Sequence, residues 1–362
     1  PKIKIYTGAT VVDSSGYVGN FTTEIMRFRG IVSEKIEHGV TIIATGAREY
    51  KPDEYLYGKS PRVLTQLELE ERIAKKSRDV ESCDSLVMIL CAGSRNGERP
   101  YCSRVCCNQA IKNAMKLKQI KPEMNIYVLY RDMRTYGFYE QYYQDAREKG
   151  VIFIRYEPER GPRVTTAKNG KGNLIVEVND PVLGEDLAID TDILALSVPM
   201  APPDEVAREI AMSYRVPLNE DKFFLEAHVK LRPVEFATEG VFVAGLAHSP
   251  KSIPETIAQA EAAAAKACTI ISKEKYKAEA TVAALNEELC DGCGICVSVC
   301  EYNALEVVDR QGGKKGEKIV QVNEAMCKGC GGCVAACPSG AMEQKGFKNE
   351  QMLAMIKAAL QS

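Results

Sequence analysis

The sequence has no excess of charge of either sign and no long apolar run. Its 47 lysine and arginine residues are balanced by 49 aspartate and glutamate residues, which gives a formal charge of -2 at pH 7. This balance argues against a nucleic-acid-binding protein, because such proteins carry a basic surface. No stretch is long and apolar enough to cross a membrane, and no charged and then apolar segment at the N-terminus indicates export. We therefore expect a cytoplasmic protein.

Cysteine, by contrast, is abundant, with 14 residues. Without an export signal, thiols are expected to stay reduced and to act as metal ligands rather than to form disulfides. Two runs near the C-terminus share the spacing Cys-x2-Cys-x2-Cys-x3-Cys, which is typical of a ferredoxin-type domain with two 4Fe-4S clusters; zinc sites usually use pairs of Cys-x2-Cys instead. In such domains the fourth cysteine of each run binds the cluster of the other run. The first predicted ligand set is thus Cys290, Cys293, Cys296 and Cys337, and the second is Cys327, Cys330, Cys333 and Cys300.

The remaining sequence predicts an α/β protein. Apolar strands at 85–90, 125–130 and 151–156 alternate with helices, the first from about 103 to 119, in the manner of a doubly wound sheet. Short strands occupy residues 1–46, a helix capped by Thr65 follows at 64–76, and hairpins with a turn at Asn169-Gly170 occupy 161–198. A buried strand at 240–245 leads into an alanine-rich helix, in which we expect Cys268 to be buried. The helix at 349–360 has one apolar face, which is expected to pack either on its own chain or on a partner.

A second group of cysteines follows the strand at 85–90. Cys91 ends this strand, and Cys102, Cys106 and Cys107 lie near the start of the next helix. A dinucleotide-binding domain carries Gly-x-Gly-x-x-Gly at this turn, and here thiols replace it. The positive end of the helix dipole favours an anionic cluster. We therefore expect a third 4Fe-4S cluster, the alternative being a set of buried or redox-active thiols.

Together these features resemble the A-type subunit of heterodisulfide reductase across essentially the whole chain. The resemblance rests on Ala44-Thr45-Gly46, on the group from Cys91 to Cys107, on Gly240-Val-Phe-Val-Ala-Gly245 with Pro250-Lys-Ser-Ile-Pro-Glu-Thr256, and on the two final runs. It implies a core similar to thioredoxin reductase, FAD, and electron transfer between the flavin and clusters. Some family members bifurcate electron pairs. Partner subunits are also implied, such as disulfide-reducing or iron-sulfur subunits, a hydrogenase or a formate dehydrogenase.

The flavin is expected where two strands end in glycine. Gly46 closes one strand, and Gly245 closes another before a loop and a helix N-terminus, although both glycines could simply serve tight turns. Lys112 is expected to bring its amine near flavin N5, unless it is a surface lysine. Glu68 is the candidate for the matching acid, and Glu70 and Glu71 compete with it. The residues expected around the cofactor are Thr45, Gly46, Gly245, Leu246, Ala247, His248, Lys251, Ile253, Pro254 and Thr256.

One half of an FAD site is missing from the sequence. No Gly-x-Gly-x-x-Gly follows a strand, and Gly245-Leu246 replaces the Gly-Asp of the wider flavoprotein class. Either a separate polypeptide completes the site or that half was lost. The leading interpretation is an electron-transfer flavo-iron-sulfur subunit, and the alternative is an iron-sulfur wiring or scaffold subunit with a vestigial flavin site. The expected parts are a partial FAD-binding region at 1–84, a Rossmann-like half with a cluster at 85–160, hairpins and a return to the FAD-binding region at 161–272, a linker at 273–285, an α+β two-cluster ferredoxin domain at 286–345 and a helix at 346–362.

Overall fold

The computed structural model describes residues 2–28, 30–167, 173–275, 277, 281–312 and 316–361. The chain divides into two compact units. The first comprises Pro1–Thr41, Thr238–Val241 and Ala265–Ser362, and the second comprises Ile42–Ala237 and Phe242–Ala264. The expected turn at Asn169-Gly170 lies outside the described residues, as do residues 276 and 278–280 of the expected linker.

A five-stranded parallel sheet organises the second unit, in the order β6-β13-β7-β8-β9. Parallel strands need long crossover connections, which helices provide from β6 to β9, whereas antiparallel strands connect β9 to β13. The Thr65 side chain caps α1 as expected, in a reciprocal box with Glu68. The strands are β6 (Val63–Thr65), β7 (Ser85–Ile89), β8 (Asn125–Tyr130), β9 (Ile152–Arg155) and β13 (Ile193–Leu196), and the helices are α1 (Gln66–Ala74), α2 (Arg78–Glu81), α3 (Cys106–Ile120) and α4 (Glu140–Glu148).

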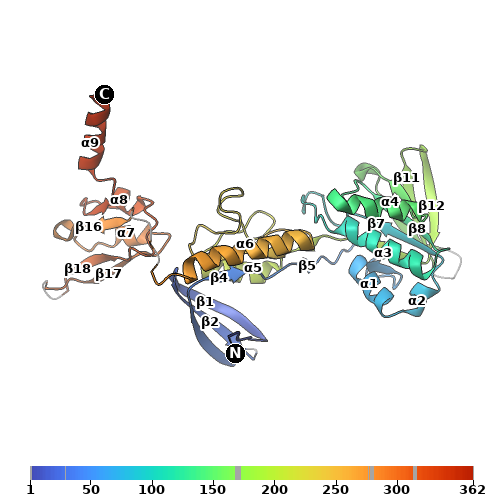
Figure 1. Ribbon diagram of the computed structural model, residues 1–362, viewed down its shortest axis with the longest axis horizontal. Coiled ribbons are helices and arrows are strands. Elements are labelled where there is room, and N and C mark those ends of the chain that lie inside the picture. The colour runs from blue at the N-terminus through green and yellow to red at the C-terminus, as the bar shows by residue number, and fades with distance from the viewer. Residues whose placement is uncertain are drawn as a thin grey trace. The chain divides into compact units, whose positions relative to one another are not determined.

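The two faces of this sheet are covered differently (Figure 1). Successive side chains of a strand point to opposite faces, so Leu86 and Met88 of β7 pack in the core with α1 and α3. Val87 and Ile89 pack instead against an antiparallel sheet of β10 (Arg163–Thr166), β11 (Leu174–Asp180) and β12 (Glu185–Thr191). The predicted α/β architecture is confirmed, and the structure adds that strands cover the second face.

Short strands and two further helices lie in the second unit or cross its boundaries in the sequence. β4 (Thr41–Ile43) pairs with β15 (Val241–Val243), and β5 (Arg48–Glu49) pairs with β14 (Met200–Ala201). In α6 (Ile253–Ile271) the buried stripe is Ala263, Ala267 and Ile270. Cys268 lies off this stripe and is exposed, so the expectation that it is buried was wrong. The other elements are α5 (Asp204–Tyr214), η1 (Gly137–Tyr139), η2 (Pro158–Arg160) and η3 (Gly245–Ala247).

The first unit contains an antiparallel sheet and the cysteine-rich domain. The sheet has the order β1-β2-β3. In the cysteine-rich domain β16 pairs with β19, and β17 pairs with β18. None of the residues of α9 (Asn349–Leu360) is buried. The other bounds are β1 (Ala9–Tyr17), β2 (Asn20–Arg27), β3 (Val32–His38), β16 (Ala283–Leu285), η4 (Glu287–Leu289), α7 (Ile295–Ser298), β17 (Leu305–Asp309), β18 (Lys318–Val322), α8 (Gly332–Ala336) and β19 (Met342–Gln344).

Among the helices of the described residues, none is both long and apolar enough to cross a membrane.

Candidate functional site

The two C-terminal cysteine runs fold into matching loops. Each loop turns into a short helix, α7 or α8, through a glycine with a left-handed backbone, and φ is +76° at Gly294 and +79° at Gly331. Glycine adopts this conformation without a steric penalty. In each run the first two cysteines thus lie in the loop, the third lies in the helix, and the fourth follows the helix.

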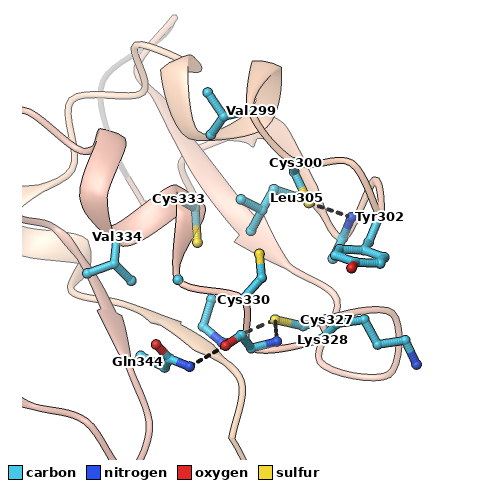
Figure 2. Close-up of a pocket in the computed structure, with 14 residues that line it drawn as sticks. Val299, Cys300, Tyr302, Leu305, Cys327, Lys328, Cys330, Cys333, Val334 and Gln344 are labelled. Atoms are coloured by element: carbon cyan, nitrogen blue, oxygen red, sulfur yellow. Dashed lines mark hydrogen bonds between the residues drawn. The ribbon is translucent and has the colours of Figure 1, made fainter. Parts of the chain in front are cut away.

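The fourth cysteine of the first run lies with the second run. Cys300 lines one pocket together with Cys327, Cys330 and Cys333, and Figure 2 shows the four sulfur atoms around the same space. Burial and the three other thiols raise the pKa of Cys333 to about 11. Thiolates held this close need a compensating positive charge, which bound iron supplies. These four residues are the predicted ligand set of the second cluster, and their arrangement fits a 4Fe-4S cluster.

The fourth cysteine of the second run, Cys337, likewise lies with cysteines of the first run. Burial, followed by the nearby thiols of Cys337 and Cys293, raises the pKa of Cys296. Burial opposes ionisation of Cys337, but hydrogen bonds from the Ser339 hydroxyl and from backbone groups outweigh it and lower the pKa of Cys337. The lowered pKa favours the thiolate form of Cys337, which is the form that binds iron.

Backbone donors and close packing support the second set. The N–H of Ala283 donates to Cys327 Sγ at 3.2 Å, and that of Ala304 donates to Cys300 Sγ at 3.3 Å. Such bonds to cysteine sulfur tune the reduction potential of a cluster. Gly329 has φ +60°, and a Cβ atom there would lie 2.2 Å from the Thr281 carbonyl oxygen. Only glycine fits at this point of the loop.

Four of the other six cysteines gather at the carboxyl end of β7. Cys91 follows the strand, and Cys106 and Cys107 begin α3. α3 starts three residues later than expected, so Cys102 lies in the preceding loop. Cys91, Cys106 and Cys107 are buried, and Cys102 is half-buried. Cys91 and Cys102 both act electrostatically on Cys106, which indicates that the four thiols form one group.

Burial and the neighbouring thiols raise the pKa of Cys91, and hydrogen bonds and arginine residues act against such shifts in this group. The Arg95 guanidinium lies 3.9 Å from Cys91 Sγ, and the N–H of Arg104 donates to Cys102 Sγ at 3.3 Å. A hydrogen bond from Cys106 lowers the pKa of Cys107, with help from Arg134 and Arg95, and the same bond raises the pKa of Cys106. Buried negative charge requires such partners, so the site suits an anionic cluster.

This geometry differs from that of a single-ion site. Across the described ranges, no three cysteine, histidine, aspartate or glutamate side chains are arranged to hold one metal ion. The four thiolates of a 4Fe-4S cluster each bind a different iron, so they are spaced more widely than the ligands of one zinc ion. Cys91 and Arg104 both have φ +62°, in the left-handed region that non-glycine residues seldom occupy. Strain of this kind is concentrated at functional sites.

The two glycine-terminated strands lie side by side. The N–H of Ala244 donates to the Ile43 carbonyl oxygen at 3.0 Å, so Thr45-Gly46 and Gly245 follow adjacent strand ends. Ligands of α/β proteins typically bind at such ends. φ is +73° at Gly46 and +71° at Gly245. A Cβ atom on Gly46 would meet nothing within 4 Å, whereas one on Gly245 would lie 3.4 Å from Thr256. Open space therefore adjoins Gly46, and the backbone at Gly245 packs on α6.

A buried lysine organises the loop after Gly245. Lys251 is 8% exposed, and its ammonium donates to the Gly245 carbonyl at 2.8 Å and the Ser249 carbonyl at 2.9 Å. Burial, followed by repulsion from Arg104, lowers its pKa to about 8. His248 lies 3.3 Å from this ammonium and 2.8 Å from Glu226. The loop thus holds a buried ammonium with a lowered pKa beside Gly245, where the flavin is expected.

The other residues expected at the flavin occupy the same loop or the first turn of α6. Leu246 and Ala247 form η3, and the Ala247 carbonyl accepts from the N–H of Phe224 at 3.0 Å. Ile253 and Pro254 are exposed, whereas Thr256 is half-buried against Gly245.

Lys112 and Glu68 have partners away from the cysteine group. Lys112 lies five residues after Cys107, which places it about 140° around the helix from that cysteine. Its side chain is 54% exposed, and its ammonium pairs with Glu70 at 2.6 Å. Glu68 accepts from the N–H of Thr65 at 2.9 Å and from the Tyr57 hydroxyl at 2.7 Å. These contacts are those of a surface lysine and a helix cap, so nothing here supports a flavin role for either residue.

Arg95, Arg104 and Glu226 were missed by the sequence reasoning. For the two arginines a signal existed, because both lie between cysteines of one group. Glu226 had none, since it is separated from His248 by 22 residues.

Comparison with known proteins identifies homologues. Residues 289–341 match the family model of a 4Fe-4S dicluster domain, which confirms the ferredoxin-type domain. The chain is 42% identical over 347 residues to the second A-type iron-sulfur subunit of CoB--CoM heterodisulfide reductase from Methanopyrus kandleri, covering 91% of this chain and 51% of that protein. It is 39% identical over 342 residues to the A-type subunit of the H(2):CoB-CoM heterodisulfide,ferredoxin reductase of Methanothermobacter marburgensis, covering 90% and 50%.

The chain is therefore homologous to these oxidoreductase subunits over most of its length, and the resemblance to the A-type subunit of heterodisulfide reductase is confirmed. It spans about half the length of the curated relatives it matches. Among solved structures, it is similar to thioredoxin reductase of T. acidophilum, with a TM-score of 0.46, 18% identity and 74% of each chain covered. A TM-score this low adds nothing to the assignment.

Proposed function

We propose, from its homology to the A-type subunit of heterodisulfide reductase, that this chain is an electron-transfer flavo-iron-sulfur subunit of a heterodisulfide-reductase-like complex. The observation that carries the proposal is the exchange of cysteines between the two runs, in which Cys300 joins Cys327, Cys330 and Cys333 around one pocket. Spacing alone predicts this exchange for two 4Fe-4S clusters, and no structural role of free thiols requires it. A 4Fe-4S cluster supplies one-electron transfer.

The group at Cys91, Cys102, Cys106 and Cys107 would hold a third cluster. Supporting this are the burial of three of the thiols and the arginine contacts on the group. Arg95 and Arg134 offset negative charge there, which makes reduction of the site less costly. With three sets of four cysteines, we expect about twelve iron atoms per chain.

FAD would meet the chain at the adjacent strand ends of β4 and β15. Gly46 leaves open space, and Lys251 holds the carbonyl of Gly245 in place. A positive charge near a flavin favours its reduced, anionic form. The Gly-x-Gly-x-x-Gly turn that grips the pyrophosphate is absent from the sequence, so we propose that another polypeptide or a further part of the protein completes the site.

The proposed partners follow from the names of the relatives. One relative is named as the A-type subunit of an H(2):CoB-CoM heterodisulfide,ferredoxin reductase, and another as the corresponding subunit of an H(2)/formate:CoB-CoM heterodisulfide,ferredoxin reductase. We therefore propose a disulfide-reducing or iron-sulfur subunit, and a hydrogenase or a formate dehydrogenase, as partners. Electron bifurcation and a cytoplasmic location are part of the same proposal.

A second candidate is an iron-sulfur wiring subunit that binds no flavin. The missing pyrophosphate turn favours it. Both candidates predict the ferredoxin clusters, but only the first predicts a flavin that exchanges electrons with them.

Anaerobic purification of the complex from its native source distinguishes the two candidates. We expect FAD in a 1:1 ratio to this chain, together with a flavin absorbance band that bleaches when the clusters are reduced. A complex with full iron and no flavin would support the wiring subunit. A complex without 4Fe-4S signals from this chain would overturn both.

A further inference from the structure

The loop before α3, residues 101–104, holds one cysteine ligand and three residues with distant partners. Cys102 is the proposed ligand, and Tyr101, Ser103 and Arg104 flank it. Each flanking side chain contacts a segment at least 97 residues away in the sequence. We name residues 101–104 the Cys102 loop.

Two of these contacts fix the strand β14. The Ser103 hydroxyl accepts from the N–H of Met200 at 2.9 Å, and the Tyr101 hydroxyl donates to the Met200 carbonyl at 3.0 Å. Ser103 is 1% exposed, so its bond is shielded from water. Tyr101 also packs edge-on against Phe223, with the ring centroids 5.5 Å apart. Both backbone groups of Met200 are therefore bound by the Cys102 loop.

The third contact reaches the loop that follows Gly245. The Arg104 guanidinium pairs with Glu255 and donates to the Pro250 carbonyl at 3.5 Å. Glu255 in turn accepts from the N–H of Ser252 at 2.8 Å and so caps the start of α6. The Tyr136 hydroxyl accepts from Arg104 at 2.8 Å and steadies the pair. Arg104 thus joins the loop beside Lys251 to the cysteine group.

We propose that the Cys102 loop couples the four-cysteine group to β14 and to residues 248–256, with Arg104 as the positioning residue for the latter. A cluster that binds Cys102 holds this loop, and the loop then holds both distant segments. Such coupling is reciprocal, so a ligand that orders residues 248–256 also strengthens binding at the cysteines. This inference rests on the proposed third cluster, and it adds that the cluster and residues 248–256 stabilise each other.

Hydrogen exchange on the full chain tests the coupling. The chain with its clusters reconstituted is compared with Cys106→Ser reconstituted in parallel, which should hold the ferredoxin pair alone. We expect the amides of the non-proline residues in 198–202 and 248–256 to exchange about tenfold more slowly when the third cluster is present, because local opening must then break the loop contacts. Iron analysis of each sample reports how many clusters are bound.

Two variants separate the two arms of the loop. In Arg104→Gln with all clusters, residues 248–256 should lose most of their protection while residues 198–202 keep theirs. Tyr101→Phe should act on the other segment: residues 198–202 should lose part of their protection, because only Ser103 then still binds Met200, while residues 248–256 keep theirs. Arg104→Lys should restore part of the effect at 248–256. Lys116→Gln changes an exposed side chain of α3, the helix that follows the Cys102 loop. It serves as the control and should alter the exchange of neither segment.

Each result bears on the inference in a different way. Full iron content with equal exchange in the presence and absence of the third cluster would overturn the coupling and leave the proposed function intact. Equal effects of Arg104→Gln and Tyr101→Phe on both segments would reduce the loop to a general packing element and would also overturn it. A native chain that binds the ferredoxin pair alone would remove the third cluster and the coupling together. Failure of flavin reduction, measured separately, would count against the proposed function only.

Discussion

Replacing Gly329 with alanine should release the second cluster, whereas the same change at Gly346 should not. Both glycines have a left-handed backbone, with φ +60° at Gly329 and +85° at Gly346. Alanine costs about 1–2 kcal/mol in this conformation, so the backbone term is shared by the two variants. They differ in their surroundings, because a Cβ atom on Gly346 would meet nothing within 4 Å.

The contact at Gly329 adds a second cost. Its Cβ atom would lie 2.2 Å from the Thr281 carbonyl oxygen, more than 1 Å short of an ordinary contact of 3.4 Å. The obstacle is backbone, which cannot rotate away, so the Cys327 to Cys333 loop must shift. Overpacking of this kind costs about 1–3 kcal/mol. At about 1.4 kcal/mol for each factor of ten, the second cluster should be lost about 5-fold to 150-fold more readily than in the control.

The assay is the rate of iron loss to a chelator under anaerobic conditions, with the cluster signal followed by absorbance and electron paramagnetic resonance. Gly329→Ala should lose about four irons in a fast phase, the content of one cluster. Gly346→Ala should match the native chain to within a few-fold. Equal rates for the two variants would refute the reasoning, because the steric contact would then have no influence on the cluster.

Four further predictions concern the cysteine group, the flavin and two lysines. Cys106→Ser should lower the iron content by about four atoms per chain while the ferredoxin pair keeps its signals, and a native chain with about eight irons would contradict the third cluster. The chain alone should bind FAD poorly, and a polypeptide with the missing Gly-x-Gly-x-x-Gly turn should restore FAD binding. Stoichiometric FAD on the isolated chain would contradict this prediction. Burial lowers the pKa of Lys251 to about 8, so between about pH 8 and 10 the unfolded chain binds more protons than the native chain, and the stability of the native chain rises with pH. Lys251→Met should lack this rise, which thermal unfolding midpoints measured at about pH 8 and pH 10 would report. Lys112→Ala should leave the flavin midpoint potential and the iron content unchanged, and a lowered potential would instead restore its expected flavin role.

The proposed ligand cysteines stand out in the sequence because their signal is local. A cluster needs several thiolates within one loop, so the spacing of Cys290 to Cys300 is itself the geometry of the site. The Thr65 cap of α1 could likewise be predicted from the sequence, since a capping box spans only four residues. The two strands that end at Gly46 and Gly245 could also be recognised, although their adjacency became evident only from the hydrogen bond between Ala244 and Ile43.

The tertiary structure alone decided what depends on residues far apart in the chain. The direction of Lys112 follows from the rotation of α3 against α1, where Glu70 supplies its partner. The hairpins at 161–198 could be recognised, but their packing over the second face of the parallel sheet could not. The pairing of Arg104 with Glu255, 151 residues later, likewise leaves no pattern in either segment. Local spacing thus determined which residues can bind iron. Long-range packing decided which charges surround them and which segments they hold, because those contacts exist only after the chain has folded.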